Sequence, residues 1–190
     1  MGLRTFLAID LPPALHSAIG ENIRTVKKEL PGLSWSKTEN LHVNLKFFGE
    51  TTESQVDQIR HAVEPVISHV SPFELELKGL GVFPDRRSPR VLWIGLGGAL
   101  DSLSKLAESV GQAVVPLGFP QEDRPFRPHL TLARVKRDHR EVGRVLGTLG
   151  LLSEPFPCGS ILVERVTLFK SDLRQTGPIH TKLWDVSLQA

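Results

Sequence analysis

The sequence predicts an α+β protein with two pseudo-symmetric lobes, each built on a largely antiparallel sheet with flanking helices. Strand-like and helix-like apolar stretches are interleaved, but several predicted strands follow one another without a helix between them, which favours antiparallel pairing. A short pattern also occurs twice, as His42-Val43-Asn44-Leu45 and as His129-Leu130-Thr131-Leu132. The two copies predict one equivalent strand in each lobe. We expect residues 1–190 to form a single two-lobed domain with an active-site groove between the lobes.

The first half of the chain predicts two strands that alternate with two helices. A strand over residues 3–10 precedes a helix that opens at Pro12 and carries apolar residues at helical spacing until about Pro31. A second strand covers residues 41–48. It is followed by a helix to about residue 70, whose start is predicted by a capping box between Thr52 and the glutamine three residues later.

The second half predicts more strands than helices. The sequence PDRRSP has turn character and separates the first two of these strands. The predicted strands cover residues 73–83, 90–96, 129–135, 159–169 and 179–188, and the predicted helices cover residues 100–115 and 138–149.

Composition narrows the possible functions. The chain has 190 residues and a net charge of only +2, so a polyanion would need a local basic patch. Cys158 is the single cysteine, which excludes an internal disulfide and a cysteine-based zinc site. The N-terminal residues read as a strand and not as a signal peptide, and no apolar run approaches the ~18 residues of a membrane span. We therefore expect a cytoplasmic protein.

The repeated pattern places two kinds of side chain on one face of each strand. Residues two apart point to the same face of a strand, about 6.5–7 Å from each other. His42 therefore shares a face with Asn44, and His129 shares a face with Thr131, while the intervening apolar residues point into a core. Each strand offers an imidazole and a hydrogen-bonding side chain to the groove.

Two facing imidazoles suit metal-independent displacement at phosphorus. With ordinary pKa values near ~6.5, one imidazole can accept a proton from a nucleophile while the other donates a proton to a leaving group. Such a displacement needs the nucleophile and the leaving oxygen in line. Thr131 and Asn44 are candidates to hold the non-bridging oxygens. Arg127 and Lys46 are candidates to neutralise the developing charge.

Aromatic and basic residues near the two patterns have two readings each. Phe48 and Phe126 are candidates for base stacking, although most aromatic side chains belong to a core. The basic run over residues 133–140 suits contact with an RNA backbone or a solvated turn. His180 lacks a matching context and is expected to be a surface or satisfied histidine.

Four segments in a fixed order resemble a known family. They are RTFLAIDLP, HVNLKFFGE, PRVLWIGL and PFRPHLTLAR. Together they resemble the two-histidine phosphoesterases, and most closely the RNA 2′,3′-cyclic phosphodiesterases long labelled 2′-5′ RNA ligases. The resemblance implies a bilobal fold with the two motifs facing across a groove. It also implies opening of a terminal RNA 2′,3′-cyclic phosphate to a 2′-phosphomonoester, with neither metal nor cofactor.

The resemblance also implies residue roles and partners. His42 would donate a proton to the departing 3′-oxygen, and His129 would activate water. Members of the family can also join or reverse certain 2′-5′ linkages. The implied partners are RNA 3′ ends bearing a 2′,3′-cyclic phosphate, with tRNA fragments among the candidates, and the expected state is a monomer.

One position departs from the family pattern and keeps alternatives open. Asn44 stands where threonine or serine is expected, and an amide differs from a hydroxyl in reach and geometry. One alternative is therefore an RNA-end or nucleotide-binding module with weak turnover. Another is a phosphodiesterase for small cyclic nucleotides.

Overall fold

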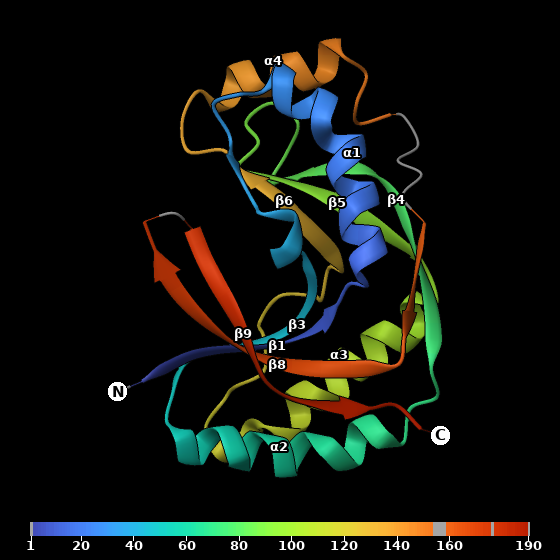
Figure 1. Ribbon diagram of the computed structural model, residues 1–190, viewed down its shortest axis with the longest axis vertical. Coiled ribbons are helices and arrows are strands. Elements are labelled where there is room, and N and C mark those ends of the chain that lie inside the picture. Colours follow the sequence, from blue (N-terminus) through green and yellow to red (C-terminus); the bar gives the residue numbers. More distant parts are fainter. Residues whose placement is uncertain (1, 154–158, 176, 190) are drawn as a thin grey trace.

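One curved antiparallel sheet organises the protein (Figure 1). The computed structural model describes residues 2–153, 159–175 and 177–189. In this part of the chain, nine strands form the sheet in the order β7-β4-β5-β6-β3-β1-β8-β9, and β2 pairs with β6. The strands are β1 (Leu3–Asp10), β2 (Ser34–Trp35), β3 (His42–Thr51), β4 (Phe73–Phe83), β5 (Val91–Gly98), β6 (His129–Arg134), β7 (Ser160–Val163), β8 (Arg165–Arg174) and β9 (Gly177–Ser187).

The predicted two-lobed antiparallel α+β fold is confirmed, with the two sheets joined into one. One half of the sheet is β3-β1-β8-β9 and the other is β6-β5-β4-β7, each written from the centre of the sheet outwards. The two halves therefore contain four strands each, in equivalent positions. They meet where β3 pairs with β6. The two strands that carry the repeated pattern are therefore direct neighbours at the centre of the sheet.

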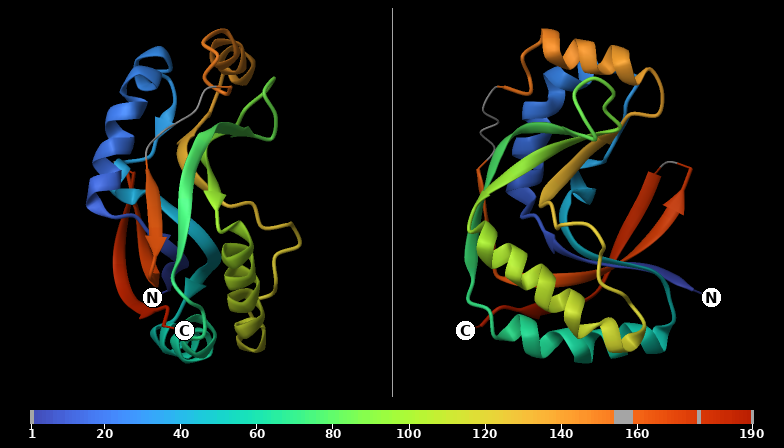
Figure 2. Two further views of the ribbon diagram at one scale, coloured as in Figure 1. Left: turned by 90° about the vertical axis from the view of Figure 1, so that its right-hand side faces the viewer. Right: turned by 180° about the vertical axis from the view of Figure 1, so that it is seen from behind.

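The helices cover the two ends of the sheet (Figures 1 and 2). α2 and α3 pack against each other beside the β3-β1-β8-β9 half, where the indole nitrogen of Trp184 on β9 donates to the carbonyl oxygen of Val56 on α2. α1 and α4 lie at the opposite end of the molecule. The helices are α1 (Pro13–Glu29), α2 (Glu53–Ser68), α3 (Leu100–Ala113) and α4 (His139–Thr148), with 3₁₀ turns at Thr38–Asn40 and Val115–Leu117.

Local sequence signals for two helices are confirmed. The predicted apolar positions of α1 are its buried residues, and they pack into the main core. The capping box of α2 is present, because Gln55 donates its backbone N–H to the Thr52 hydroxyl and its side chain accepts from the Thr52 N–H. None of the helices in the described ranges combines the length and the apolar character that a membrane crossing requires.

The single strand predicted over residues 159–169 is wrong, because the chain changes halves in the middle of it. β7 pairs with β4 in one half of the sheet, and β8 pairs with β1 in the other. The change of partner occurs at Glu164, whose carbonyl accepts from the Leu188 N–H. Only Glu164 and Arg165 separate the apolar residues of the two strands, and no glycine or proline marks a turn, so periodicity did not reveal the crossing.

β3 is longer and less regular than the prediction. It continues past Gly49, whose φ of 77° suits a residue without a Cβ, to Thr51. Its register against β1 shifts twice, leaving Leu45 and Phe48 as the extra residues of two bulges. A bulge interrupts the alternation of side chains, so residues beyond Asn44 no longer follow the predicted faces.

Candidate active site

The site begins at a single residue pair in the middle of the sheet. Val43 on β3 lies opposite Leu130 on β6, and both side chains are completely buried. Each is the second residue of its copy of the repeated pattern. The pair therefore aligns the two copies about a local twofold axis and turns the polar side chains of both copies to the opposite face of the sheet.

Four polar side chains share that opposite face. In antiparallel register, His42 stands opposite Thr131, and Asn44 stands opposite His129. Asn44 is exposed and the other three are half-buried. The two histidines are diagonal neighbours, a relation that separates Cα atoms by about 7–8 Å. The charges of the two imidazoles interact, but His129 lines a large pocket, whereas His42 lines a small one beside Phe6, Phe169 and His180.

Both imidazoles are held in the same way. His42 Nδ1 lies 2.8 Å from the carbonyl oxygen of Asn40, and His129 Nδ1 lies 2.6 Å from the carbonyl oxygen of Arg127. A carbonyl only accepts hydrogen bonds, so each Nδ1 carries a proton and donates it. Nε2 is then the nitrogen of each ring that can gain or lose a proton.

His42 is enclosed by aromatic rings. Its ring centroid lies 4.5 Å from that of Phe6 and 6.5 Å from that of Phe169, both at tilted angles. Burial lowers the pKa of His42, the hydrogen bond to the Asn40 carbonyl raises it, and the neighbouring His129 lowers it. Burial has the largest influence, so the pKa of His42 lies below its ordinary value.

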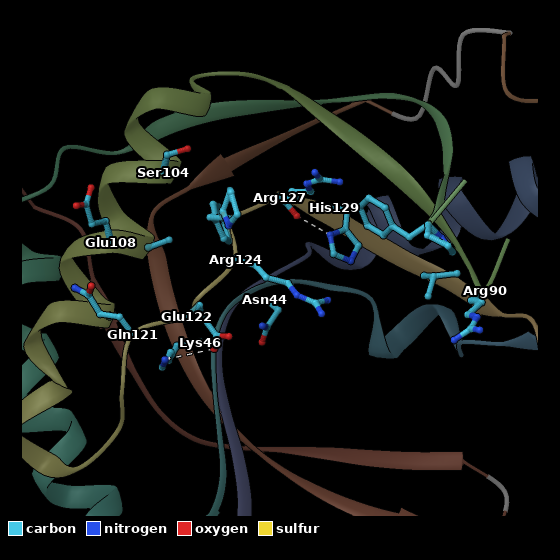
Figure 3. Close-up of a pocket in the computed structure, with 17 residues that line it drawn as sticks. Asn44, Lys46, Arg90, Ser104, Glu108, Gln121, Glu122, Arg124, Arg127 and His129 are labelled. Carbon is cyan, nitrogen blue, oxygen red and sulfur yellow. Dashed lines mark hydrogen bonds and ion pairs between the residues drawn. The ribbon is translucent and has the colours of Figure 1, made fainter. Parts of the chain in front are cut away.

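A pocket of about 1020 Å³ opens across the join between the two half-sheets (Figure 3). Asn44 from one half and His129 from the other both line it. A volume of this size reaches the upper end of the range for small-ligand sites. Beside His129 the lining is basic, and towards α3 it is acidic or neutral apart from Lys46, which pairs with Glu122. The basic residues are Arg90, Arg124 and Arg127, and the residues at the α3 side are Ser104, Glu108, Gln121 and Glu122.

Comparison with known proteins shows the family of this chain. A family model described as the 2′-5′ RNA ligase superfamily matches residues 12–175. The chain belongs to the 2′-5′ RNA ligase superfamily. An RNA 2′,3′-cyclic phosphodiesterase of Methanothermobacter thermautotrophicus is 35% identical over 185 residues, covering 96% of this chain and 97% of the relative. One of Archaeoglobus fulgidus is 36% identical over 184 residues, covering 95% and 98%.

Solved structures of other proteins have a similar fold over the full length of this chain. The crystal structure of a phosphoesterase matches with a TM-score of 0.80 at 27% identity and covers 100% of both chains. E. coli LigT complexed with 3′-AMP matches with a TM-score of 0.76 at 25% identity, again over 100% of both chains. The continuous curved sheet is thus shared with solved structures of other proteins.

Within this superfamily fold, the candidate substrate-binding residues occupy different places. Phe126 and Arg127 line the pocket, and the Arg127 guanidinium lies 5.9 Å from the centre of the Phe83 ring. Lys46 also lines the pocket but is only 5% exposed, because its ammonium donates to the Pro120 carbonyl and pairs with Glu122.

Phe48 is not brought into the pocket. It is 9% exposed and packs edge-on against Phe119, with 5.0 Å between ring centroids. The bulges of β3 change the face on which this part of the strand presents its side chains, which explains its place in the core.

His180 on β9 is the residue that sequence reasoning missed. Its ring stands perpendicular to that of His42 at 5.4 Å, and edge-on to that of Phe6 at 4.9 Å. Its Nδ1 is buried without a hydrogen-bond partner among the described residues, so the expectation of a surface or satisfied histidine is wrong. Burial, followed by the charge of His42, lowers the pKa of His180 to about 4. The contact joins strands far apart in the sequence, and no local pattern signals it.

Replacing His180 with phenylalanine should make the protein more acid-stable. The lowered pKa means that the unfolded chain binds a proton more readily than the folded protein between about pH 6.5 and pH 4, so stability is lost as pH falls through that window. Solvent screening of a half-buried ring reduces the effect to about 1 kcal/mol at pH 5. Denaturant unfolding at pH 5 and pH 8 checks this.

The matched control for that prediction is His61→Phe, on the exposed surface of α2. The His180→Phe variant should gain stability relative to the parent at pH 5 but not at pH 8. An equal change at both pH values would show that the effect is packing and not protonation.

Clusters of possible metal ligands are absent among the side chains that the structure describes. Among residues 2–153, 159–175 and 177–189, no three histidine, cysteine, aspartate or glutamate side chains gather in an arrangement that would hold a metal ion. The groups available at the motif face are the imidazoles, the Asn44 amide, the Thr131 hydroxyl and the nearby guanidiniums.

Proposed function

We propose that this protein hydrolyses terminal RNA 2′,3′-cyclic phosphates to 2′-phosphomonoesters, using His42 and His129 as its acid and base. The observation that carries the proposal is the matched pair of imidazoles on one face, each with Nδ1 bound to a backbone carbonyl and Nε2 left for proton exchange. The curated relatives named RNA 2′,3′-cyclic phosphodiesterase support the choice of substrate.

The proposed reaction moves one proton at each histidine. Nε2 of His129 takes a proton from water, and the water oxygen forms a bond to phosphorus. The bond from phosphorus to the ribose 3′-oxygen breaks, and that oxygen takes a proton from Nε2 of His42. The phosphate remains on the 2′-oxygen. His129 ends protonated and His42 neutral, so exchange with solvent returns both rings to their starting states.

The surroundings of the two rings support this division of roles. His129 borders the large pocket, where water and RNA have access, whereas His42 is packed against Phe6. Burial lowers the pKa of His42 in the free protein. An anionic cyclic phosphate beside the ring opposes that effect and favours its protonated form. Thr131 and Asn44 flank the histidines at positions suited to the non-bridging phosphate oxygens.

The same site would also carry out reversible 2′-5′ ligation in this proposal. A ribose hydroxyl of a second RNA end attacks the cyclic phosphate in place of water and forms a 2′-5′ linkage, and the reverse step breaks that linkage and re-forms the cyclic phosphate, with the same two histidines. The pocket volume of about 1020 Å³ supports room for a nucleoside beside the cyclic phosphate. We further predict that tRNA fragments are among the substrates, that the protein is cytoplasmic and that it is a monomer.

Incubation with an oligoribonucleotide that ends in a 2′,3′-cyclic phosphate should yield a 2′-phosphate, with the same rate in excess EDTA. Chromatography against 2′- and 3′-phosphate standards identifies the product. Loss of activity with chelator, or a 3′-phosphate product, would contradict the proposed mechanism.

The alternatives from the sequence give different results in that assay. Binding of the RNA end without product would favour a binding module. A mononucleoside 2′,3′-cyclic phosphate cleaved as efficiently as the oligonucleotide would favour a phosphodiesterase for small cyclic nucleotides.

A further inference from the structure

A cluster of exposed cations lies beyond the Arg90 side of the pocket. Part of it belongs to the β4–β5 connection and part to the end of β6 and the residues that follow. We call this cluster the basic platform. It consists of Arg86, Arg87, Arg90, Arg134, Lys136 and Arg137, all of them exposed.

Backbone contacts hold the two segments of the basic platform side by side. Arg134 pairs with Val91 in the sheet, and the Val135 N–H donates to the Arg90 carbonyl at 2.9 Å. His139 at the start of α4 contributes a third contact, between its Nδ1 and the Pro89 carbonyl at 2.9 Å. The cluster is therefore one surface built from two segments.

α4 also packs directly on the β4–β5 connection. A Cβ at Gly143 would lie 2.3 Å from the carbonyl oxygen of Arg86, so only glycine permits this approach without a shift of the backbone. Figure 2 shows the connection lying against α4. The connection that carries Arg86 and Arg87 is therefore packed against α4 and is not a free loop.

The six cations of the basic platform form no ion pair with the carboxylates that the structure describes. In the described part of the chain, no carboxylate oxygen lies within 4.0 Å of a charged nitrogen of these six residues, whereas Arg60, Arg144 and Arg165 elsewhere are paired. The nearby Asp85 accepts instead from the backbone N–H groups of Arg87 and Ser88. On a chain of net charge +2, six cations on one surface without an ion-pair partner among the described residues form the local basic patch that a polyanion needs.

The basic platform is continuous with the pocket. Arg90 belongs to both, and β6 runs from His129 in the pocket to Arg134 on the platform. Regular strand rise puts these two residues about 17 Å apart at most, because β6 has a register shift at Leu132. A mononucleotide held at His129 does not span that distance, whereas an RNA chain of several nucleotides does.

We propose that the basic platform binds the sugar-phosphate backbone of the RNA on the 5′ side of the cyclic phosphate. This inference rests on the proposed function and adds that the protein is built for polynucleotide ends. The RNA leaves the pocket past Arg90 and lies across Arg134 towards Lys136 and Arg137. Contacts to phosphates carry no base preference, so the platform raises the rate for RNA of any sequence.

The test is the double variant Lys136→Glu/Arg137→Glu, assayed on two substrates. On a ten-nucleotide RNA with a 2′,3′-cyclic end, kcat/KM at about 0.1 M salt should fall tenfold or more, mainly through KM. On a mononucleoside 2′,3′-cyclic phosphate it should stay within twofold of the parent. Removing two phosphate contacts should also reduce the slope of log affinity against log salt by about 1.4 for single-stranded RNA.

The matched control is Arg60→Glu/Arg165→Glu, which makes the same change in net charge. Arg60 lies on α2, and Arg165 begins β8 near the end of that helix, at the other end of the molecule from α4. This variant should keep the parent kcat/KM on both substrates within twofold. An equal loss on RNA in the control and platform variants, an equal loss on both substrates in the platform variant, or no loss on RNA would overturn the inference.

A binding measurement separates this inference from the proposed function. Fluorescence anisotropy with an RNA that ends in a 3′-phosphate reports binding without turnover. Weaker binding by the platform variant supports the platform even if the parent protein yields no product, and unchanged binding overturns it.

Discussion

Replacing His129 with alanine should lower kcat on an RNA 2′,3′-cyclic end by about 10³–10⁴, and His42→Ala should have an effect of similar size. In the proposed mechanism each imidazole transfers a proton, and loss of such a group costs about 10²–10⁴ in rate. The upper part of that range is expected because His180, the imidazole next to His42, has a pKa lowered to about 4 and is a poor substitute as a proton donor near neutral pH. Removing both histidines should cost little more than removing one, since the two act as a unit.

The control for these variants is His61→Ala. The Nδ1 of His61 also lies 2.8 Å from a backbone carbonyl, that of Asp57, but the residue is exposed on α2, away from the motifs. Single-turnover rates and thermal unfolding should be measured together. A folded His42→Ala or His129→Ala protein with a near-normal rate would remove that histidine from the mechanism.

Replacing Thr131 with alanine should lower kcat by about 10²–10³, the usual cost of one preorganised donor to a developing negative charge. Asn44→Ala should lower it by about 10². Asn44→Thr should stay within about tenfold of the parent, because either an amide or a hydroxyl can donate to a phosphate oxygen. Asn44 stands opposite His129, as Thr131 stands opposite His42, so the two donors have equivalent positions on the site face.

The comparison of the Asn44 variants decides what the amide contributes. Substrate affinity, measured with a product-like 2′-phosphate, should change less than kcat if the donor acts mainly on the transition state. Full activity of Asn44→Ala would show that the amide plays no part. In that case Thr131 and the guanidiniums beside the pocket would hold the phosphate.

The sequence predicts the face of the site because that face depends on local geometry. Residues two apart in a strand point the same way, so His42 with Asn44 and His129 with Thr131 follow from the pattern alone. The elements with clear periodicity, such as α1 and α2, are also recovered near their observed bounds. The site face and these helices depend on interactions between residues close in the sequence, so the sequence pattern alone is enough to predict them.

The features that were missed depend on contacts between distant segments. The bulges of β3 arise from its pairing with β1, and they place Phe48 in the core and Lys46 against the Pro120 carbonyl. The contact of His180 with His42 arises from the order of the strands in the sheet. The partner change at Glu164 has the same origin. None of these has a periodic signature, because each is set by which strands become neighbours.

The pairing of Val43 with Leu130 determines whether the two histidines are in position before a substrate binds. Two lobes linked by a flexible connection would have to close before their histidines could act together. Here the histidines are side chains of adjacent strands in one sheet, so main-chain hydrogen bonding sets their separation. If the two histidines act as the proposed acid and base, they are in place before RNA binds, and the free energy of RNA binding is not needed to bring them together.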